Sequence, residues 1–369
     1  MSADVSGDAG GEGRLRVVVT GASGNVGTSV LEALAAHPRV GSVLGIARRT
    51  PRWSPARTEW ARADLGQEGA TADLTGLFEG ADAVVHLAWL IQPTHAPLTT
   101  WRTNVLGTER VLRAMAAAGV PALVYSSSVG AYAPGPTAPG SGPVDESWPT
   151  HGWPQAAYTR EKAYVERLLD TFERDHPGIR VVRMRPSFMF KEHSAMEQRR
   201  LFMGPLLPHR LVRPGVVPVV PDLPGLTFQA LHTDDAADAF TRAVVGDAAG
   251  AFNLAAGPPV DAATLAGLLS ARVVRVPRPA VRTALAVAWR LRAVPASPYL
   301  FDAFVRLPLM DTGRARRELD WTPRRTGPET LAEFLRGLRE GRGMDTPTLT
   351  GRLPGGRLRE AATNLAGRP

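Results

Sequence analysis

Five short apolar runs, separated by stretches with helical spacing, constrain the fold of this chain more than any other feature. The runs are RVVVTG (16–21), SVLGIA (42–47), AVVHLAW (83–89), ALVYSSS (122–128) and IRVVRMR (179–185). Runs of this length and composition are typical of strands buried on both faces of a parallel sheet. Residues 26–37 and 103–119 repeat apolar side chains with a helical period, and Gly119 and Pro121 close the second helix. The alternation predicts an α/β fold with a Rossmann-type doubly wound parallel sheet.

The strand pattern stops after Arg185, where a Pro-rich region (205–225) is followed by helical spacing near 233–245 and 261–270. We predict a smaller, mostly C-terminal substrate-binding subdomain beside the sheet domain. The predicted boundaries are 14–186 for the sheet domain, with 231–256 returning to it, and 187–230 with 257–342 for the subdomain. Residues 1–13 and 343–369 lack apolar periodicity and are predicted to be disordered tails. The Gly- and Pro-rich stretch 134–154 is predicted to be a long loop beside the functional site.

Positive charge is spread along the chain. The 43 Lys and Arg exceed the 35 Asp and Glu, and the net charge of +8 raises the question of nucleic acid binding. The arginines stand mostly singly or in pairs among acids and alanines, without aromatic residues interleaved for stacking on bases. We therefore expect no nucleic-acid partner.

Other site chemistries are excluded by residue usage. The chain has no cysteine, which removes disulfides, thiol nucleophiles and thiolate zinc sites. The 8 histidines are dispersed without a His-x-x-x-His pair, so we predict no metal. Arg or Pro interrupts every apolar stretch early, and the N-terminus is acidic and Gly-rich, unlike a secretory signal. We expect a soluble, cytoplasmic protein with no membrane partner.

The first apolar run leads into a glycine motif. Gly21, Gly24 and Gly27 have the spacing Gly-x-x-Gly-x-x-Gly, directly after a predicted strand and at the start of a predicted helix. Glycine allows a tight turn and a close backbone approach to a pyrophosphate, and the helix N-terminus offers amides and partial positive charge. The motif predicts a dinucleotide site, with contacts from Gly21, Ser23, Gly24, Asn25, Val26 and Gly27.

The end of the second predicted strand bears on which dinucleotide binds. An acidic residue there would accept a hydrogen bond from the ribose of NAD, whereas arginine suits the 2′-phosphate of NADP. This chain has Ala47 followed by Arg48 and Arg49, so NADP(H) is favoured and NAD(H) is the alternative if these arginines are ordinary surface residues. Asp64 and Leu65 open the next loop and are predicted to lie near the adenine.

Tyr158 and Lys162 stand four residues apart in the sequence YTREK, which places them on one face of a helix. A tyrosine with a pKa of about 10 is a poor acid–base catalyst near neutral pH. A cation about 4 Å away favours the phenolate by about 4 kcal/mol at an effective dielectric of about 20, which would lower the phenol pKa. Lys162 and Lys191 are the only lysines of an arginine-rich chain, which singles out the pair.

These motifs together resemble the extended short-chain dehydrogenase/reductase family, also described as the NAD-dependent epimerase/dehydratase family. The resemblance covers roughly residues 14–340. It rests on TGASGNVG (20–27), HLAW (86–89), NVLGT (104–108), YSSSVGAY (125–132), YTREK (158–162), LHTDDAADA (231–239) and FNLAAG (252–257), in the order that the family shows.

The resemblance implies a role for each catalytic candidate. Ser128 would hold the substrate oxygen, Tyr158 would move the proton, Lys162 would bind the ribose and lower the pKa of Tyr158, and Asn104 would complete the set. The further cofactor contacts that it implies are Leu87, Ala88, Ser126, Tyr158, Lys162 and Pro186. It also implies a homodimer through the helices that follow the fourth strand.

Three departures from the family's patterns bear on the substrate. Ser128 is followed by Val129 and Gly130, where the family's dehydratases resemble one another in an acidic pair. Pro186 or Ser187 stands where the sugar-nucleotide members resemble one another in Asn, and Phe228 stands where they resemble one another in Arg. We therefore expect a small-molecule substrate that is a largely apolar carbonyl or secondary alcohol.

Three functions stay open at this point. The first is an NADP(H)-dependent carbonyl reductase or secondary alcohol dehydrogenase. The second is a redox-neutral epimerase of sugar nucleotides, for which Arg183, Arg199, Arg200 or Arg213 would have to supply a diphosphate site. The third is a non-catalytic NADP(H)-binding regulator, against which the intact Tyr158 and Lys162 count.

Overall fold

The computed structural model describes residues 13–136, 142–204 and 208–352. Its centre is a seven-stranded sheet in the order β10-β6-β5-β4-β1-β2-β3, in which every neighbouring pair is parallel. The strands are β1 (Leu15–Thr20), β2 (Val40–Ala47), β3 (Thr58–Arg62), β4 (Ala83–His86), β5 (Ala122–Ser126), β6 (Arg180–Pro186) and β10 (Gly250–Leu254). This confirms the predicted Rossmann-type fold.

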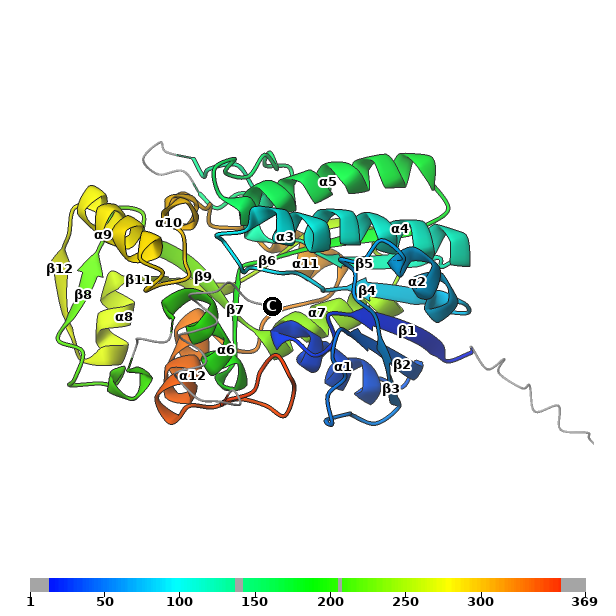
Figure 1. The fold of residues 1–369 in the computed structure, drawn as a ribbon, viewed down its shortest axis with the longest axis horizontal. Helices are drawn as coiled ribbons and strands as arrows, with labels where there is room; N and C mark the ends of the chain where they lie inside the picture. Colours follow the sequence, from blue (N-terminus) through cyan, green and yellow to red (C-terminus); the bar gives the residue numbers. More distant parts are fainter. Residues whose placement is uncertain (1–12, 137–141, 205–207, 353–369) are drawn as a thin grey trace, which may run out of the picture.

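Helices cover both faces of the sheet (Figure 1). One face packs against α1 (Asn25–Ala36), α7 (Thr233–Val245) and α11 (Gly313–Glu318). The other packs against α2 (Ala70–Phe78), α4 (Gly107–Ala118) and α5 (Ala157–Asp175). The strands at the sheet centre are buried on both sides, which explains why they appear in the sequence as continuous apolar runs.

Two details of the sheet domain differ from the predictions, and each has a local cause. Strand β3 was not predicted because TEWAR carries charged residues at the outer edge of the sheet, where only one neighbour pairs with it. The helix predicted over 103–119 is divided. It begins as α3 (Pro97–Trp101), passes through a π-helical turn (Arg102–Leu106) and continues as α4 to Gly119, whose φ of 69° is the left-handed cap that glycine favours.

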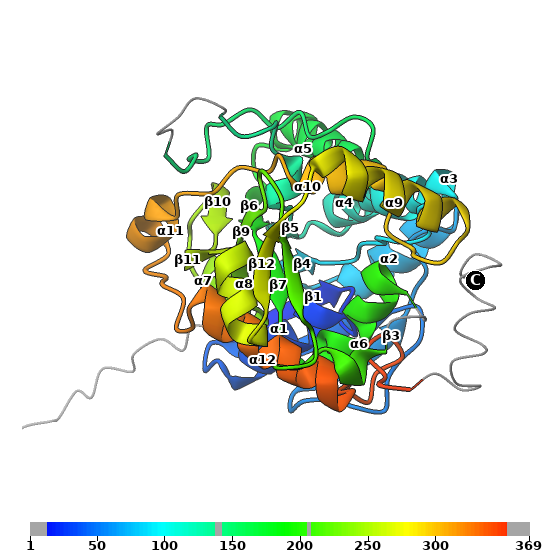
Figure 2. The ribbon, with the colours of Figure 1, turned by 90° about the vertical axis from the view of Figure 1, so that its left-hand side faces the viewer.

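The rest of the described chain builds a second layer beside the carboxyl ends of the strands (Figures 1 and 2). A three-stranded sheet contains β7 (Phe188–Phe190), β9 (Thr227–His232) and β11 (Ala256–Asp261), and a parallel pair contains β8 (Val219–Asp222) and β12 (Arg272–Arg275). The helices are α6 (Ala195–Gln198), α8 (Ala262–Leu269), α9 (Arg278–Arg290), α10 (Pro298–Phe304) and α12 (Gly327–Glu340).

The expected disordered tails lie mostly outside the described residues, with one exception. Residues 1–12 and 353–369 are not described, but residues 343–352 are, and Leu349 among them is completely buried. The prediction of a tail from residue 343 onward is therefore wrong for this segment, because its few apolar side chains are buried by tertiary contacts that periodicity does not reveal. Within the predicted loop 134–154, Val144 forms a bridge with Met310 and Gly135 donates to the Arg306 carbonyl.

Candidate active site

The glycine motif forms a tight turn at the end of β1. Gly21 has a φ of 70°, and a Cβ there would lie 2.6 Å from the backbone nitrogen of Ala88, at the end of β4. A Cβ on Gly27 would lie 2.4 Å from the Gly21 carbonyl oxygen. Both positions therefore require glycine, because any larger residue would push the turn away from β4 or from α1.

The start of α1 suits a pyrophosphate. Gly24 is its N-cap and supplies no side-chain hydrogen bond, and the first turn contains no acidic residue, so no side chain of the first turn offsets the partial positive charge of this helix end. The buried Oδ1 of Asn25 has no hydrogen-bond partner among the described residues. The residues present therefore fit a dinucleotide, with Ser23, Gly24, Asn25 and Val26 at its phosphates.

The other predicted cofactor residues border the same edge of the sheet. Arg48 and Arg49 are exposed directly beyond β2. Asp64 accepts from the Gly66 amide, and the Leu65 carbonyl accepts from Arg110. Leu87 and Ala88 follow β4, Ser126 ends β5 and Pro186 ends β6. The carboxyl ends of these parallel strands meet beside the glycine turn, where doubly wound folds bind their ligands.

Ser128 and Tyr158 are in direct contact. The Tyr158 hydroxyl donates to Ser128 Oγ at 3.0 Å, and Ser128 Oγ also accepts from the Gly130 amide at 2.9 Å. A Cβ on Gly130 would lie 2.8 Å from the Tyr158 ring, so glycine is needed for this approach. Because Oγ accepts twice, the serine O–H is the donor that remains for a substrate oxygen.

Lys162 lies one helical turn beyond Tyr158 but points toward β5. Its Nζ donates to the Ser126 carbonyl at 2.7 Å and to the Tyr125 hydroxyl at 3.3 Å, and it lies 3.5 Å from the centroid of the Trp89 ring. Burial lowers the pKa of Lys162 well below its ordinary value, against the attraction of Glu166 and Glu161. Burial also raises the pKa of Tyr158, although its bond to Ser128 opposes that effect. The lowering of the Tyr158 pKa by Lys162 therefore stays a prediction.

Asn104 lies behind this pair, in the π-helical turn. Its Oδ1 accepts from the Leu90 amide at 2.7 Å, and its Nδ2 donates to the Leu90 carbonyl at 2.8 Å and to Glu161 at 2.7 Å. Thr100 donates to the other oxygen of Glu161. Asn104 thus fixes the chain that follows β4, and in this structure it acts on the site as a positioning residue.

A buried ion network supports the helix that carries Tyr158. Glu166, one turn beyond Lys162 on α5, accepts from Arg185 at 3.0 Å, from Arg183 at 3.1 Å and from the Ser127 hydroxyl at 2.6 Å. All four side chains are buried. The network joins α5 to the ends of β5 and β6, and it therefore sets the position of Ser128 relative to Tyr158.

A cavity of about 270 Å³ opens beside Tyr158. One wall comes from the segment after β4 and the start of α5, and the other from α9, α10 and the segment between them. Its lining is Leu90, Ile91, Thr94, His95, Pro97, Thr100, Gln155, Ala156, Ala157, Tyr158, Arg160, Glu161, Trp289, Ser297, Tyr299 and Leu300. This cavity is the candidate substrate pocket, because Tyr158, the residue that would transfer the proton, lines it.

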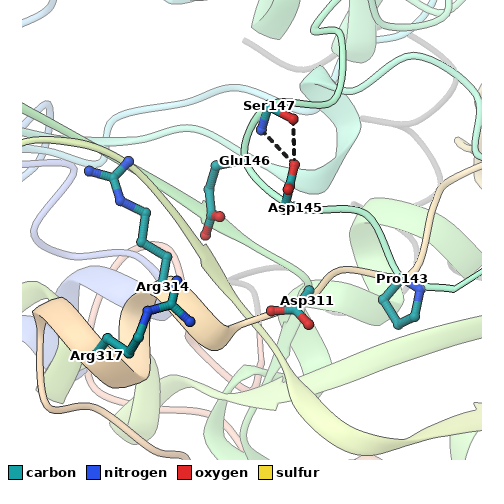
Figure 3. A pocket seen from close by; sticks show the side chains of 7 residues that line it. All are labelled: Pro143, Asp145, Glu146, Ser147, Asp311, Arg314 and Arg317. Atoms are coloured by element: carbon teal, nitrogen blue, oxygen red, sulfur yellow. Dashed lines mark hydrogen bonds between the residues drawn. The ribbon is translucent and has the colours of Figure 1, made fainter.

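A larger hollow of about 530 Å³ lies elsewhere (Figure 3). Its lining is polar and charged, with Asp145, Glu146 and Asp311 facing Arg314 and Arg317 across it. It shares no residue with the cavity beside Tyr158.

The described residues contain no group of three His, Cys, Asp or Glu side chains placed to hold a metal ion. No helix in the described part of the chain is long and apolar enough to cross a membrane.

Sequence reasoning missed Lys191 as a support for the cofactor site. Its buried Nζ donates to Thr28 Oγ1 at 2.6 Å and to Ser29 Oγ at 3.1 Å, both in α1. Burial lowers the pKa of Lys191 to about 8, against the attraction of Asp234 and other acids. The rarity of lysine in this chain could have drawn attention to Lys191. Its position at the start of α1, however, is visible only in the fold.

Comparison with known proteins assigns a family. Residues 17–255 match the model of the NAD dependent epimerase/dehydratase family. A ketoreductase of Stigmatella aurantiaca, described as acting on 4-hydroxy-2-methyl-3-oxo-4-farnesyl-3,4-dihydroquinoline-1-oxide, is 33% identical over 177 residues, which are 48% of this chain and 51% of that protein. Human UDP-glucose 4-epimerase is 32% identical over 171 residues, 42% of this chain and 47% of that protein. The chain thus spans about half the length of these curated relatives.

Solved structures agree with the fold. UDP-glucose 4-epimerase of Thermus thermophilus in complex with NAD has a TM-score of 0.66 at 18% identity, over 88% of this chain and 99% of that one. dTDP-glucose 4,6-dehydratase of Streptomyces venezuelae with NAD bound has a TM-score of 0.66 at 21% identity, over 88% and 97%. The match of the family model over more than half of the chain shows that this protein is a member of the NAD-dependent epimerase/dehydratase family.

Proposed function

We propose that this protein is an NADP(H)-dependent oxidoreductase that interconverts a largely apolar ketone or aldehyde and its alcohol. The observation that carries the proposal is the hydrogen bond between Tyr158 and Ser128, together with the position of Tyr158 in the wall of a cavity that several apolar side chains line. Carbonyl reduction requires a group that protonates the carbonyl oxygen and a donor that holds this oxygen in place. The Tyr158 phenol can do the first and the Ser128 hydroxyl the second.

The reaction balances with these groups. NADP(H), when bound, supplies the hydride for reduction or accepts it in oxidation. The Ser128 hydroxyl donates a hydrogen bond to the carbonyl oxygen of the substrate, and Tyr158 transfers its proton to that same oxygen. In sum, the carbonyl compound, NADPH and one proton become the alcohol and NADP⁺. Lys162 binds the ribose of the cofactor. To do so, its ammonium must turn away from the Ser126 carbonyl and the Trp89 ring, which it contacts in this structure.

Packing on the substrate side supports an apolar substrate. Phe188, Phe228 and Phe304 form a cluster with ring centroids 5.1 to 5.7 Å apart, so Phe228, which stands where the sugar-nucleotide members resemble one another in Arg, packs among apolar rings. Arg183, one possible source of a diphosphate site, is already paired with Glu166 and Asp170. A diphosphate needs paired donors that converge on it, which arginine supplies best.

We expect NADP(H) to bind about 10- to 100-fold more tightly than NAD(H), because charge-assisted hydrogen bonds from Arg48 and Arg49 to the 2′-phosphate contribute about 1.5–3 kcal/mol. Arg48→Ala should remove most of this preference, whereas Arg113→Ala, an exposed arginine on α4, should keep it. Titration of both cofactors by nicotinamide fluorescence measures the effect. Equal affinities in the unaltered protein would contradict the assignment.

We expect the NADP-loaded protein to bind neither uridine nor thymidine diphosphate sugars at micromolar concentration, because the cavity beside Tyr158 offers one arginine, Arg160, and many apolar atoms. Isothermal titration with both nucleotides and their sugars tests this. In parallel, oxidation of NADPH should be detectable with apolar ketones or aldehydes. Micromolar binding of a nucleotide sugar, with no net change in NADPH, would favour the epimerase and refute the substrate class proposed here.

We also propose the division of the chain into a cofactor domain (14–186 with 231–256) and a substrate subdomain (187–230 with 257–342). A homodimer through α4 and α5 belongs to the same proposal. It is supported by Tyr164 of α5, which is 49% exposed and packs against Trp101, and by Leu98, which is 72% exposed nearby on α3. Apolar side chains this exposed on adjacent helices are typical of a surface that another chain covers.

A further inference from the structure

Residues 343–351 form a closed loop that was predicted to be a disordered tail. Its two ends touch, because a Cβ on Gly343 would lie 2.2 Å from the Gly351 nitrogen. Inside the loop, the Met344 amide donates to the Leu349 carbonyl at 3.0 Å, and the Leu349 amide donates to Thr346 Oγ1 at 3.1 Å. Leu349 is 0% and Thr346 3% exposed. The loop is therefore a packed element of the fold.

The loop contacts the glycine motif at Ser23. Thr346 Oγ1 donates to the Ser23 carbonyl at 3.0 Å, and Thr348 Oγ1 lies 3.4 Å from Ser23 Oγ. The carbonyl and the hydroxyl of Ser23 thus both contact one loop that lies more than 300 residues away in the sequence. Figure 1 shows this segment, which follows α12, against α1.

The same loop also contacts the substrate layer. Nη2 of Arg200 donates to the Thr348 carbonyl at 3.1 Å, and Arg200 is a buried residue that follows α6 in the substrate layer. The loop therefore connects the glycine turn at the end of β1 to the segment that follows α6.

Ser23 follows the part of the glycine turn that is bonded to β2. Its neighbours Gly21 and Ala22 donate their amides to the Ile46 carbonyl of β2, the strand that leads to Arg48 and Arg49. In doubly wound folds the end of this strand meets the adenosine ribose. A loop attached to Ser23 is therefore placed beside that ribose and its 2′-phosphate.

We propose that the 343–351 loop is the outer wall of the adenosine half of the cofactor site, that it fixes Ser23, and that it must move for the dinucleotide to enter or leave. This inference rests on the NADP(H) binding proposed above. The loop lies beyond residues 17–255, the part matched by the family model, so it is a feature that the family match does not account for.

The absence of cysteine from the chain allows a direct test. In the double variant Ser23→Cys with Thr348→Cys, the two sulfur atoms replace hydroxyls 3.4 Å apart, so oxidation should join loop and turn by the only disulfide of the protein. The oxidised form should release NADPH at least about tenfold more slowly than the same protein after reduction, as followed by stopped-flow nicotinamide fluorescence. The single variant Thr348→Cys is the control and should not respond to oxidation.

A second pair of variants tests the loop without altering Ser23. A chain ending at Arg342 lacks the loop, and a chain ending at Arg352 keeps it. The shorter chain should release NADPH about tenfold faster, since loss of the contacts to Ser23 is equivalent to about one or two hydrogen bonds, whereas the longer chain should match the full protein.

The outcomes separate the two proposals. If the full protein binds NADPH but neither the disulfide nor the truncation changes its release, the role of the loop is refuted and the proposed function stands. Failure of the full protein to bind NADPH or NADH refutes the proposed function and, with it, the loop as a wall of that site.

Discussion

Replacing Tyr158 by phenylalanine should lower turnover about 10²- to 10⁴-fold, the range expected for loss of a general acid. Cofactor affinity should stay within about twofold, because the ring that packs edge-on against Trp89 is retained and only the hydroxyl bonded to Ser128 is removed. Steady-state kinetics on the best carbonyl substrate, together with NADPH titration, measure both quantities on the same preparation.

Matched variants make this result specific. Ser128→Ala should lower the rate by about 10², the effect of losing one polarising donor. Tyr164→Phe, on the same helix but 49% exposed, should leave both turnover and cofactor affinity unchanged. Near-normal turnover of the Tyr158→Phe protein would show that another group moves the proton.

Replacing Glu166 by glutamine should reduce the free energy of unfolding by about 3–5 kcal/mol, because the buried Arg185 would lose its carboxylate partner, while Arg183 would keep only Asp170 and Glu173. Arg183 and Arg185 are 6% and 5% exposed, so solvent cannot replace Glu166. Urea unfolding measures the loss. Glu109→Gln is the control: it removes a surface pair with Arg113 and should cost at most about 1 kcal/mol.

The contribution of Glu166 should depend on pH in a defined direction. Burial alone would raise its pKa, but hydrogen bonds and charge from Arg185, with Ser127 and Arg183, outweigh burial and lower the pKa to about 2. Since this lies below the value of about 4.3 for an unfolded glutamate, the stabilisation is complete above about pH 4.3 and is lost as the pH falls toward 2. The Glu166→Gln protein should lack this part of the pH dependence, and an unchanged acid profile would contradict the network.

Much of the fold was predictable because its determinants are local. The buried strands appear as apolar runs since neighbours cover both faces, and the glycine spacing indicates a strand, turn and helix within a dozen residues. The four-residue spacing of Tyr158 and Lys162 likewise placed both on α5. An edge strand such as β3 gives no comparable signal, because it is only half covered.

The sequence by itself determined the doubly wound sheet, the glycine turn and the residue types available for proton transfer, since each depends on neighbours along the chain. Only the tertiary structure decided which groups meet. Asn104 binds Leu90 and Glu161 rather than Tyr158, and Lys162 turns to Ser126 and Trp89. The 343–351 loop reaches Ser23 across more than 300 residues. Such contacts depend on burial and on hydrogen bonds that form once distant segments pack together, and neither spacing nor periodicity encodes that packing.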